Sequence, residues 1–260
     1  MRNLLYANFM RLWKSRTFWA CMALMAFFGL RVFYFLTKEE GILDSPSFLF
    51  LTDVSILLSV YYSSFISGEY GDGIIRNKLM VGAVRPAVYF ANLISCIAAG
   101  FLMCAAFILP NWVLTYLFFG QSEWVDYIYT PGQVMLSLLA STAVIVSYSA
   151  IFSMIGMNIQ HKAAGPVAVV FAAAALYLNG MICETELAFY QQDPERFHYS
   201  KTRLAYYHLF GEWLPGGQVR LLSSHAGNPY RALELVMYSL IIIAASTGAG
   251  LLLFRRRDLK

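Results

Sequence analysis

The 260-residue chain is 59% hydrophobic and only 13% charged, whereas ordinary globular chains are about 45–50% apolar and about 25% charged. One compact core could not bury this much apolar surface, so the composition excludes a typical soluble protein and predicts an all-α integral membrane protein. The formal net charge of +4 is too small for the broad basic field that binds nucleic acid, and we expect no nucleic-acid partner.

Six runs with few or no charges are long enough to cross a bilayer, which takes about 20 residues in a helix. They cover residues 17–36, 48–66, 87–122, 131–155, 166–182 and 235–254. The third run is too long for one simple crossing. We expect its helix to tilt, or to bend at Pro110 and continue beyond the membrane.

Basic residues are distributed unevenly between the two sides that these spans define. The side that holds both termini carries Arg2, Arg11, Lys14, Arg16, Arg76, Lys78, Arg85, Lys162, Arg255, Arg256, Arg257 and Lys260. The short loops on the opposite side, 37–47 and 120–130, contain one lysine and five acidic residues. Because cytoplasmic segments of membrane proteins are enriched in Lys and Arg, both termini are predicted to be cytoplasmic.

Residues 1–16 have a two-sided helical pattern. One arc of the helix carries Leu5, Tyr6, Phe9, Met10, Leu12 and Trp13, and the other carries Asn3, Asn8, Arg11, Lys14 and Ser15, with Leu4 as an exception. This pattern predicts an amphipathic interfacial helix lying in the inner leaflet. The alternative is a basic flank that only sets the topology.

The inner segment 67–86, between the second and third spans, is the most informative part of the sequence. Glycines at 68, 71 and 73 interrupt the apolar run. The side chains of Ile74, Ile75, Lys78 and Leu79 then favour a short helix that presents an apolar and a basic edge to a cytoplasmic partner. The alternative is a positively charged loop without a partner.

Two charged residues, Arg31 and Asp53, lie inside predicted spans. Each costs about 2.5–3.5 kcal/mol at the centre of a bilayer and less toward its edges. Both are about 7–8 Å below the outer surface if the helices rise 1.5 Å per residue, so their side chains can meet. We expect a structural ion pair; the alternatives are a pair that lines an outward cavity, or an arginine that extends to the headgroups.

The extracytoplasmic segment 183–234 mixes aromatic residues with charges, which suits a boundary between water and lipid. We predict short outer helices that lie on or dip into the outer leaflet. Their turn is expected at Pro215, Gly216, Gly217 and Gln218. The alternative is a soluble cap that stands clear of the membrane.

The inner segment resembles the first cytoplasmic loop of the permeases of the ABC-2 type exporter family. That loop commonly reads Gly-Glu-Tyr, then Gly, an aliphatic and a basic residue, Leu, Gly and Arg. The matching residues here are Gly68, Glu69, Tyr70, Gly73, Ile75, Arg76, Leu79, Gly82 and Arg85. Ile74 departs from the pattern, because the family usually has Thr there. The order of the elements over the whole chain also resembles that of the family.

The resemblance implies that residues 1–260 form one permease domain of a bacterial cell-membrane exporter. Such a permease pairs with a second permease chain, as a homodimer or heterodimer, and docks separate ABC ATPase subunits. The coupling role of the family's loop is assigned here to the matching residues from Gly68 to Arg85, and a secondary role to 156–165. Glu69 and Arg76 are expected to pair with ATPase residues or with the N-terminal helix.

The chain itself is expected not to be an enzyme. It contains no GxxxxGK[ST] phosphate loop, so ATP and Mg²⁺ are expected in the partner ATPase and no cofactor in this chain. The order Asp72-Gly73-Ile74-Ile75-Arg76 is similar to the core of membrane phosphatidyltransferases. However, the two further aspartates which that chemistry needs are missing, because the next aspartate along the chain is Asp126.

No metal site or disulfide framework is indicated either. The histidines, His161, His198, His208 and His225, form no HExxH motif, and the cysteines, Cys21, Cys96, Cys104 and Cys183, have no CxxC spacing.

The sequence leaves the substrate open between an antimicrobial peptide such as a lantibiotic, a drug and an ion. A membrane anchor that docks an ATPase without moving a solute is a further alternative.

Overall fold

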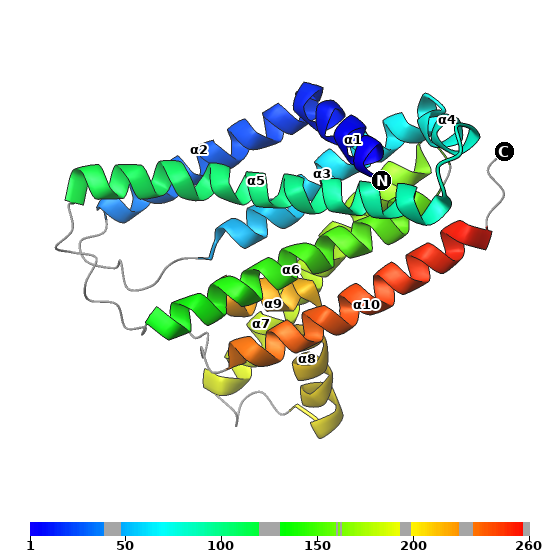
Figure 1. The fold of residues 1–260 in the computed structure, drawn as a ribbon. Helices are drawn as coiled ribbons and strands as arrows, with labels where there is room; N and C mark the ends of the chain where they lie inside the picture. The colour runs from blue at the N-terminus through cyan, green and yellow to red at the C-terminus, as the bar shows by residue number, and fades with distance from the viewer. Residues whose placement is uncertain are drawn as a thin grey trace.

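The computed structural model describes residues 1–38, 48–119, 131–159, 161, 163–192, 199–223 and 231–256, and within these ranges the regular structure is helical, without strands. The helices in chain order are α1 (Arg2–Lys14), α2 (Arg16–Lys38), α3 (Phe50–Gly71), α4 (Ile74–Met80), α5 (Arg85–Phe119), α6 (Pro131–Asn158), α7 (Ala164–Gln192), α8 (Lys201–Trp213), α9 (Pro215–Ser223) and α10 (Ala232–Arg256) (Figure 1). The predicted all-α class is confirmed.

Six of these helices, α2, α3, α5, α6, α7 and α10, are long and apolar enough to cross a membrane. They correspond to the six runs expected from the sequence and indicate a multi-pass membrane protein. Helix α5 has 35 residues and includes Pro110. Its length of about 50 Å exceeds the hydrocarbon thickness, so part of it extends beyond the bilayer or the helix is tilted.

Helix α7 continues well beyond the predicted end of the fifth span. The apolar run ends at residue 182, but the helix extends to Gln192. Glu184 and Glu186 are accommodated in this extension because each pairs with an arginine, Arg220 of α9 and Arg203 of α8 respectively. The connecting segment between the last two spans therefore begins ten residues later than the sequence suggested.

Helices α1 and α4 lie at the same end of the bundle as the end of α10, and we call this the α4 end (Figure 1). An even number of spans brings the chain back to the end where it began. Helix α8 lies toward the opposite end, where α7 finishes and α10 starts.

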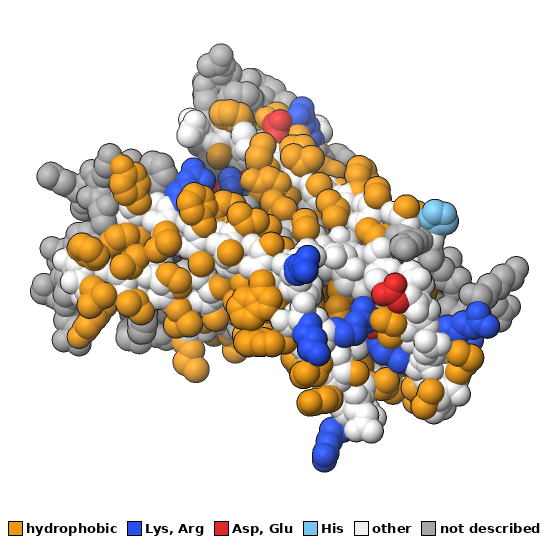
Figure 2. Space-filling view, turned by 90° about the horizontal axis from the view of Figure 1, so that it is seen from above, with side chains coloured by type: hydrophobic (Ala, Val, Ile, Leu, Met, Phe, Trp, Pro, Cys, Tyr) orange, Lys and Arg blue, Asp and Glu red, His pale blue; other side chains and the backbone are white. Residues whose placement is uncertain are grey.

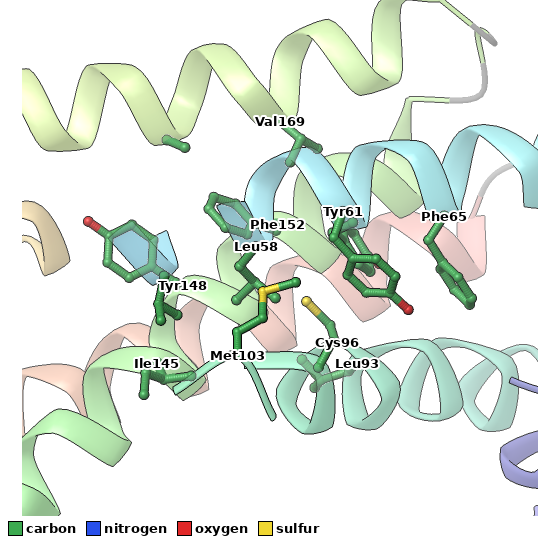
Figure 3. Packing of buried hydrophobic residues seen from close by; sticks show 14 of the residues in the cluster. Leu58, Tyr61, Phe65, Leu93, Cys96, Met103, Ile145, Tyr148, Phe152 and Val169 are labelled. Atoms are coloured by element: carbon green, nitrogen blue, oxygen red, sulfur yellow. The ribbon is translucent and has the colours of Figure 1, made fainter. Parts of the chain in front are cut away.

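The buried core is centred on α3, α5 and α6. Leu58 and Tyr61 of α3 pack with Cys96 of α5 and with Tyr148 and Phe152 of α6 (Figure 3). In its most apolar stretch α3 is 61% buried, whereas α2, α7 and α10 are each 22% buried. Helix α3 is thus the central helix, and the other three are peripheral.

The peripheral helices have apolar outer faces. Exposed side chains include Phe27 of α2, Phe171 of α7 and Leu240 of α10. Figure 2 shows hydrophobic side chains over much of the face that it presents. So large an apolar surface is unfavourable in water and suits contact with lipid chains or with another membrane helix.

Helix α9 packs closely against α7 and α8, where glycines replace larger side chains. A Cβ on Gly216 would lie 1.8 Å from the carbonyl oxygen of Leu176 in α7, and a Cβ on Gly217 would lie 1.9 Å from that of Gly211 in α8. Gly180 of α7 faces the Gly216 carbonyl in the same way. Only glycine allows the three backbones to approach this closely.

The predicted turn at Pro215, Gly216, Gly217 and Gln218 is therefore corrected. These four residues form the first turn of α9 and are buried. The change of direction falls at Leu214, which has an extended backbone between α8 and α9. The glycines serve close packing, and the proline starts the helix, where its missing N–H is not needed.

The close contact at α9 gives a first prediction. Replacing Gly216 with Ala is expected to destabilise the protein by about 1–3 kcal/mol, because the added methyl group collides with backbone that cannot move aside easily. Gly248→Ala in α10 is the matched control, since nothing lies within 4 Å of the position of its Cβ. Thermal unfolding of both variants in detergent measures the difference. Equal midpoints would show that the α7–α9 contact is loose.

Candidate functional site

The segment that contains the predicted coupling residues folds as the end of α3, the short helix α4 and the start of α5. Gly73, before α4, has a φ of 65°, and Gly82, after α4, has a φ of 92°. Both values lie in the left-handed region that favours glycine. These two glycines allow the chain to enter and leave α4 within a short connection and place α4 across the end of the bundle.

Glu69 lies at the centre of a buried polar group, which we call the Glu69 cluster: Asn8, Arg11, Glu69, Lys78 and Asn92. The Glu69 side chain is 0% exposed, and its Oε1 accepts hydrogen bonds from Arg11 and Lys78. Asn92 donates from Nδ2 to Oε2 of Glu69 at 2.8 Å. Both carboxylate oxygens thus have partners, as a buried charge requires.

Two asparagines complete the cluster. Asn8 donates to Oδ1 of Asn92 at 2.7 Å, and Lys78 donates to Oδ1 of Asn8 at 2.9 Å. The guanidinium of Arg11 also lies over the Phe65 ring, 4.8 Å from its centroid. Through these contacts the cluster connects four helices, α1, α3, α4 and α5.

The predicted polar arc of the N-terminal helix α1 is divided between water and the protein: Asn3 and Lys14 are exposed, whereas Asn8 and Arg11 turn inward. Asn8 is fully buried, and Arg11 contacts Glu69. Leu12, on the predicted apolar arc, is also buried, while Tyr6, Phe9, Met10 and Trp13 are exposed. The helix takes this orientation because Glu69 and Asn92 supply buried partners for its polar side chains. Glu69 was expected to pair either with an ATPase or with the N-terminal helix. In the structure its partner is Arg11 of the N-terminal helix.

Tyr70 and Arg85 attach the same segment to the other half of the bundle. The Tyr70 hydroxyl donates to the backbone carbonyl of Met157, near the end of α6. Arg85 donates to the carbonyls of Phe254 and Arg255 at 3.3 and 2.9 Å. A guanidinium is favoured at these free carbonyls, because the C-terminus of α10 is the negative end of its dipole.

The outward side of α4 and of the turn after it is exposed. Arg76 is exposed, and Met80, Val81 and Val84 are 67%, 90% and 64% exposed. We call these four residues the α4 tip. Leu79 packs against the core, and Ile75 beneath the tip is 1% exposed. Of the predicted coupling residues, Arg76 is therefore placed for an external contact, whereas Glu69 is enclosed.

Positions 160 and 162 of the second inner loop, 156–165, lie outside the described residues. At its start, Asn158 donates to the Gly250 carbonyl of α10 at 3.2 Å. His161 accepts hydrogen bonds from the backbone N–H groups of Ala163 and Ala164, both at 3.4 Å. This loop contacts the predicted coupling segment through the bond from Tyr70 to Met157.

Arg31 on α2 is exposed and Asp53 on α3 is half-buried, in helices that pack together. The structural ion pair between Arg31 and Asp53 therefore stays a prediction.

Ion pairs and aromatic contacts fasten α8 to its neighbours. Arg231, just before α10, contacts Glu212 at 2.7 Å, and this hydrogen bond raises the pKa of the arginine. The hydrogen bond from the Tyr199 hydroxyl to Glu186 raises the pKa of that hydroxyl. The Trp213 ring also stacks on Tyr238 of α10 at 4.5 Å between centroids. Helix α8 is thereby fixed to both α7 and α10.

Within the described part of the chain, no group of three or more His, Cys, Asp or Glu side chains is placed to hold a metal ion. The four cysteines are free and buried. His208 pairs with Glu212 at 3.1 Å, whereas His198 and His225 lie outside the described residues.

No protein-family model matches the chain, and no curated protein sequence is significantly similar to it. The six apolar helices are compatible with membrane proteins that have many different activities.

The sequence analysis named Glu69, Lys78 and Asn8 separately, but it did not predict that they meet in one buried cluster and did not single out Asn92. A usable signal was present, because Asn92 is one of two asparagines in the long uncharged run 87–122. A buried amide needs hydrogen-bond partners, so its position indicates a polar neighbour on another helix. The pattern of a single span does not reveal which helix supplies that neighbour.

The Glu69 cluster gives a second prediction. Glu69→Ala leaves Arg11 and Lys78 without their common partner, and we expect it to lower stability by about 3–5 kcal/mol, as the loss of one member of a buried ion pair does. Asp72→Asn is the control, because Asp72 is an exposed acidic residue three positions away. Its expected effect is within about 0.5 kcal/mol. The measurement is thermal unfolding in detergent, and a similar small effect of both variants would contradict the structural role of Glu69.

Proposed function

We propose that the chain is the membrane-spanning permease subunit of an ABC-2 type ATP-driven exporter, with the α4 tip as the docking element for a separate ATPase. The observation that supports this most directly is an exposed apolar and basic tip on a helix that is held firmly from beneath. ATP and Mg²⁺ belong to the ATPase partner in this proposal, and the permease contributes the path across the membrane.

The orientation of the proposed exporter follows from the charges at the α4 end. The described basic residues at this end are Arg2, Arg11, Lys14, Arg16, Arg76, Lys78, Arg85, Arg255 and Arg256. Glu69 and Asp72 are the described acidic residues in the same segments. Such an excess of positive charge favours a cytoplasmic location of this end in a bacterial cell membrane, where an ATPase has access to ATP.

The α4 tip suits a protein groove better than water. Met80, Val81 and Val84 expose apolar side chains next to the cationic Arg76. A groove with an apolar floor and an acidic rim would bury the first three and pair with the fourth. A force on the tip would reach α1, α3 and α5 through Lys78 and Glu69, since these residues belong to the same buried cluster.

The two ends of the bundle have different roles in this proposal. At the α4 end, α1 lies at the inner membrane surface with Tyr6, Met10 and Trp13 facing lipid. At the opposite end, α8 and α9 are the outer helices, and α9 dips between α7 and α10, where Ser239 donates to Gln218 at 2.7 Å.

The apolar faces of the peripheral helices leave room for a second permease chain. Antimicrobial peptides and drugs are the substrate classes that fit so apolar a surface.

Docking at the α4 tip gives a third prediction. Arg76→Glu combined with Met80→Asp is expected to reduce co-purification of an ATPase with the tagged chain at least about tenfold, because the change reverses a charge and buries a new one. Membrane insertion should persist. Mass spectrometry of the purified complex and its ATPase rate are the measurements. The control is Arg255→Glu with Leu252→Asp, which alters the exposed surface of α10 near the same end.

An unchanged complex in the tip variant would contradict the proposed docking element. An ATPase that binds and hydrolyses ATP, while no solute moves in reconstituted vesicles, would favour a membrane anchor over an exporter.

Topology gives a fourth prediction. A cysteine in place of exposed Lys201 should react with an impermeant maleimide in intact cells, whereas one in place of exposed Asn77 should react only after permeabilisation. The native cysteines give little background because all four are buried. Labelling of position 77 in sealed cells would overturn the orientation.

A further inference from the structure

A cluster of exposed basic and aromatic side chains surrounds the connection between α1 and α2, which consists of Ser15 alone. Lys14 and Arg16, on either side of Ser15, are exposed. Trp13 and Trp19 are 59% and 44% exposed. We call these four residues the α1–α2 elbow.

The two tryptophans of the elbow are held in a defined geometry. Their ring centroids lie 4.9 Å apart with an angle of 78° between the planes. The indole Nε1 of Trp19 donates to the carbonyl oxygen of Trp13 at 2.8 Å. An ordered pair of exposed tryptophans is unusual on a surface in water, whereas tryptophan is enriched at the headgroup level of membranes.

The positive charge of the elbow has no acidic partner among the residues that the structure describes. The first 38 residues contain no Asp or Glu, and the carboxylate of Glu69 is occupied by Arg11 and Lys78. Among the described residues, neither Lys14 nor Arg16 forms an ion pair, whereas Arg203, Arg220 and Arg231 toward the opposite end all do. The charge at the elbow is thus available to an external anion.

The apolar surface beside these charges runs along one face of α1. Tyr6, Met10 and Trp13 follow one another at helical spacing on the face directed away from the protein, and all three are exposed. The opposite face is fixed by Asn8 and Leu12, which are buried. Because the protein side of α1 is anchored through the Glu69 cluster, the exposed aromatic face cannot turn inward to escape water.

We propose that the α1–α2 elbow binds the headgroup of an anionic phospholipid, with Lys14 and Arg16 at the phosphate and with Trp13 and Trp19 against the upper part of the acyl chains. Charge complementarity selects the anionic headgroup, and the aromatic face selects a lipid over a soluble anion. The elbow lies at the first residues of the first span, which is the depth of the headgroups. The proposal rests on the membrane orientation proposed above and assigns a lipid class to that surface.

The test uses tryptophan quenching in the full chain. Trp112, Trp124 and Trp213 are replaced by Phe, so that only the two elbow tryptophans fluoresce. The protein is reconstituted into equimolar phosphatidylglycerol and phosphatidylcholine, with bromine on the chains of one lipid or of the other. We expect stronger quenching by brominated phosphatidylglycerol, corresponding to an enrichment of about fivefold per basic residue at low salt. High salt should reduce it.

The matched variants remove the same amount of charge at two places. K14Q/R16Q is expected to abolish the enrichment, and R255Q/R256Q, which removes two exposed charges at the end of α10, is expected to preserve it. An equal loss in both variants would mean that general surface charge attracts the lipid, and it would overturn a site at the elbow. Equal quenching by both brominated lipids in the parent protein would also overturn the anionic preference while leaving the membrane orientation intact. Absence of quenching by either lipid would show that the elbow does not contact the bilayer, and it would overturn the proposed place of α1 at the membrane surface as well.

Discussion

The buried carboxylate of Glu69 is the constraint on which the α4 end depends. A carboxylate that is 0% exposed must be paired, and its partners come from three other helices, Arg11 of α1, Lys78 of α4 and Asn92 of α5. Each partner therefore holds its own helix in place against α3. The pairing of this one charge therefore contributes to the arrangement of α1 and α4, together with the burial of Leu12 and Ile75 in the core.

The outward surfaces of α1 and α4 combine apolar and basic side chains. Asn8, Arg11 and Lys78 are used inside, at the Glu69 cluster, whereas Lys14 stays exposed beside Tyr6 and Trp13 on α1, and Arg76 stays exposed beside Met80 on α4. In a soluble protein such surfaces would be a liability. Here the outward surface of α1 suits a lipid leaflet, and the outward surface of α4 suits a protein partner. These are the two surroundings proposed for this end.

The opposite end is stabilised by a different means. Gly180, Gly211, Gly216 and Gly217 let the backbones of α7, α8 and α9 approach until no further side chain fits between them. Where apolar burial between helices has little driving force because lipid is equally apolar, close packing and interhelical hydrogen bonds replace it. The bond from Ser239 to Gln218 adds such a contact between α10 and α9. The α4 end thus depends on a buried charge, whereas the opposite end combines close glycine packing with ion pairs between α8, α9 and their neighbours.

The sequence by itself determined the six apolar helices, the break at the glycines around α4 and the uneven distribution of basic residues, because these depend on local composition and on the solvent properties of a bilayer. Only the tertiary structure decided which way each helix faces. The amphipathic pattern of residues 1–16 could not show that Asn8 and Arg11 point inward, since their partners Glu69 and Asn92 are distant in sequence. Likewise, Pro215 to Gln218 has the composition of a turn, yet contacts with Leu176 and Gly211 make it the buried start of a helix. Composition is a local property, whereas the direction of a polar side chain depends on which residue forms its hydrogen bond or ion pair.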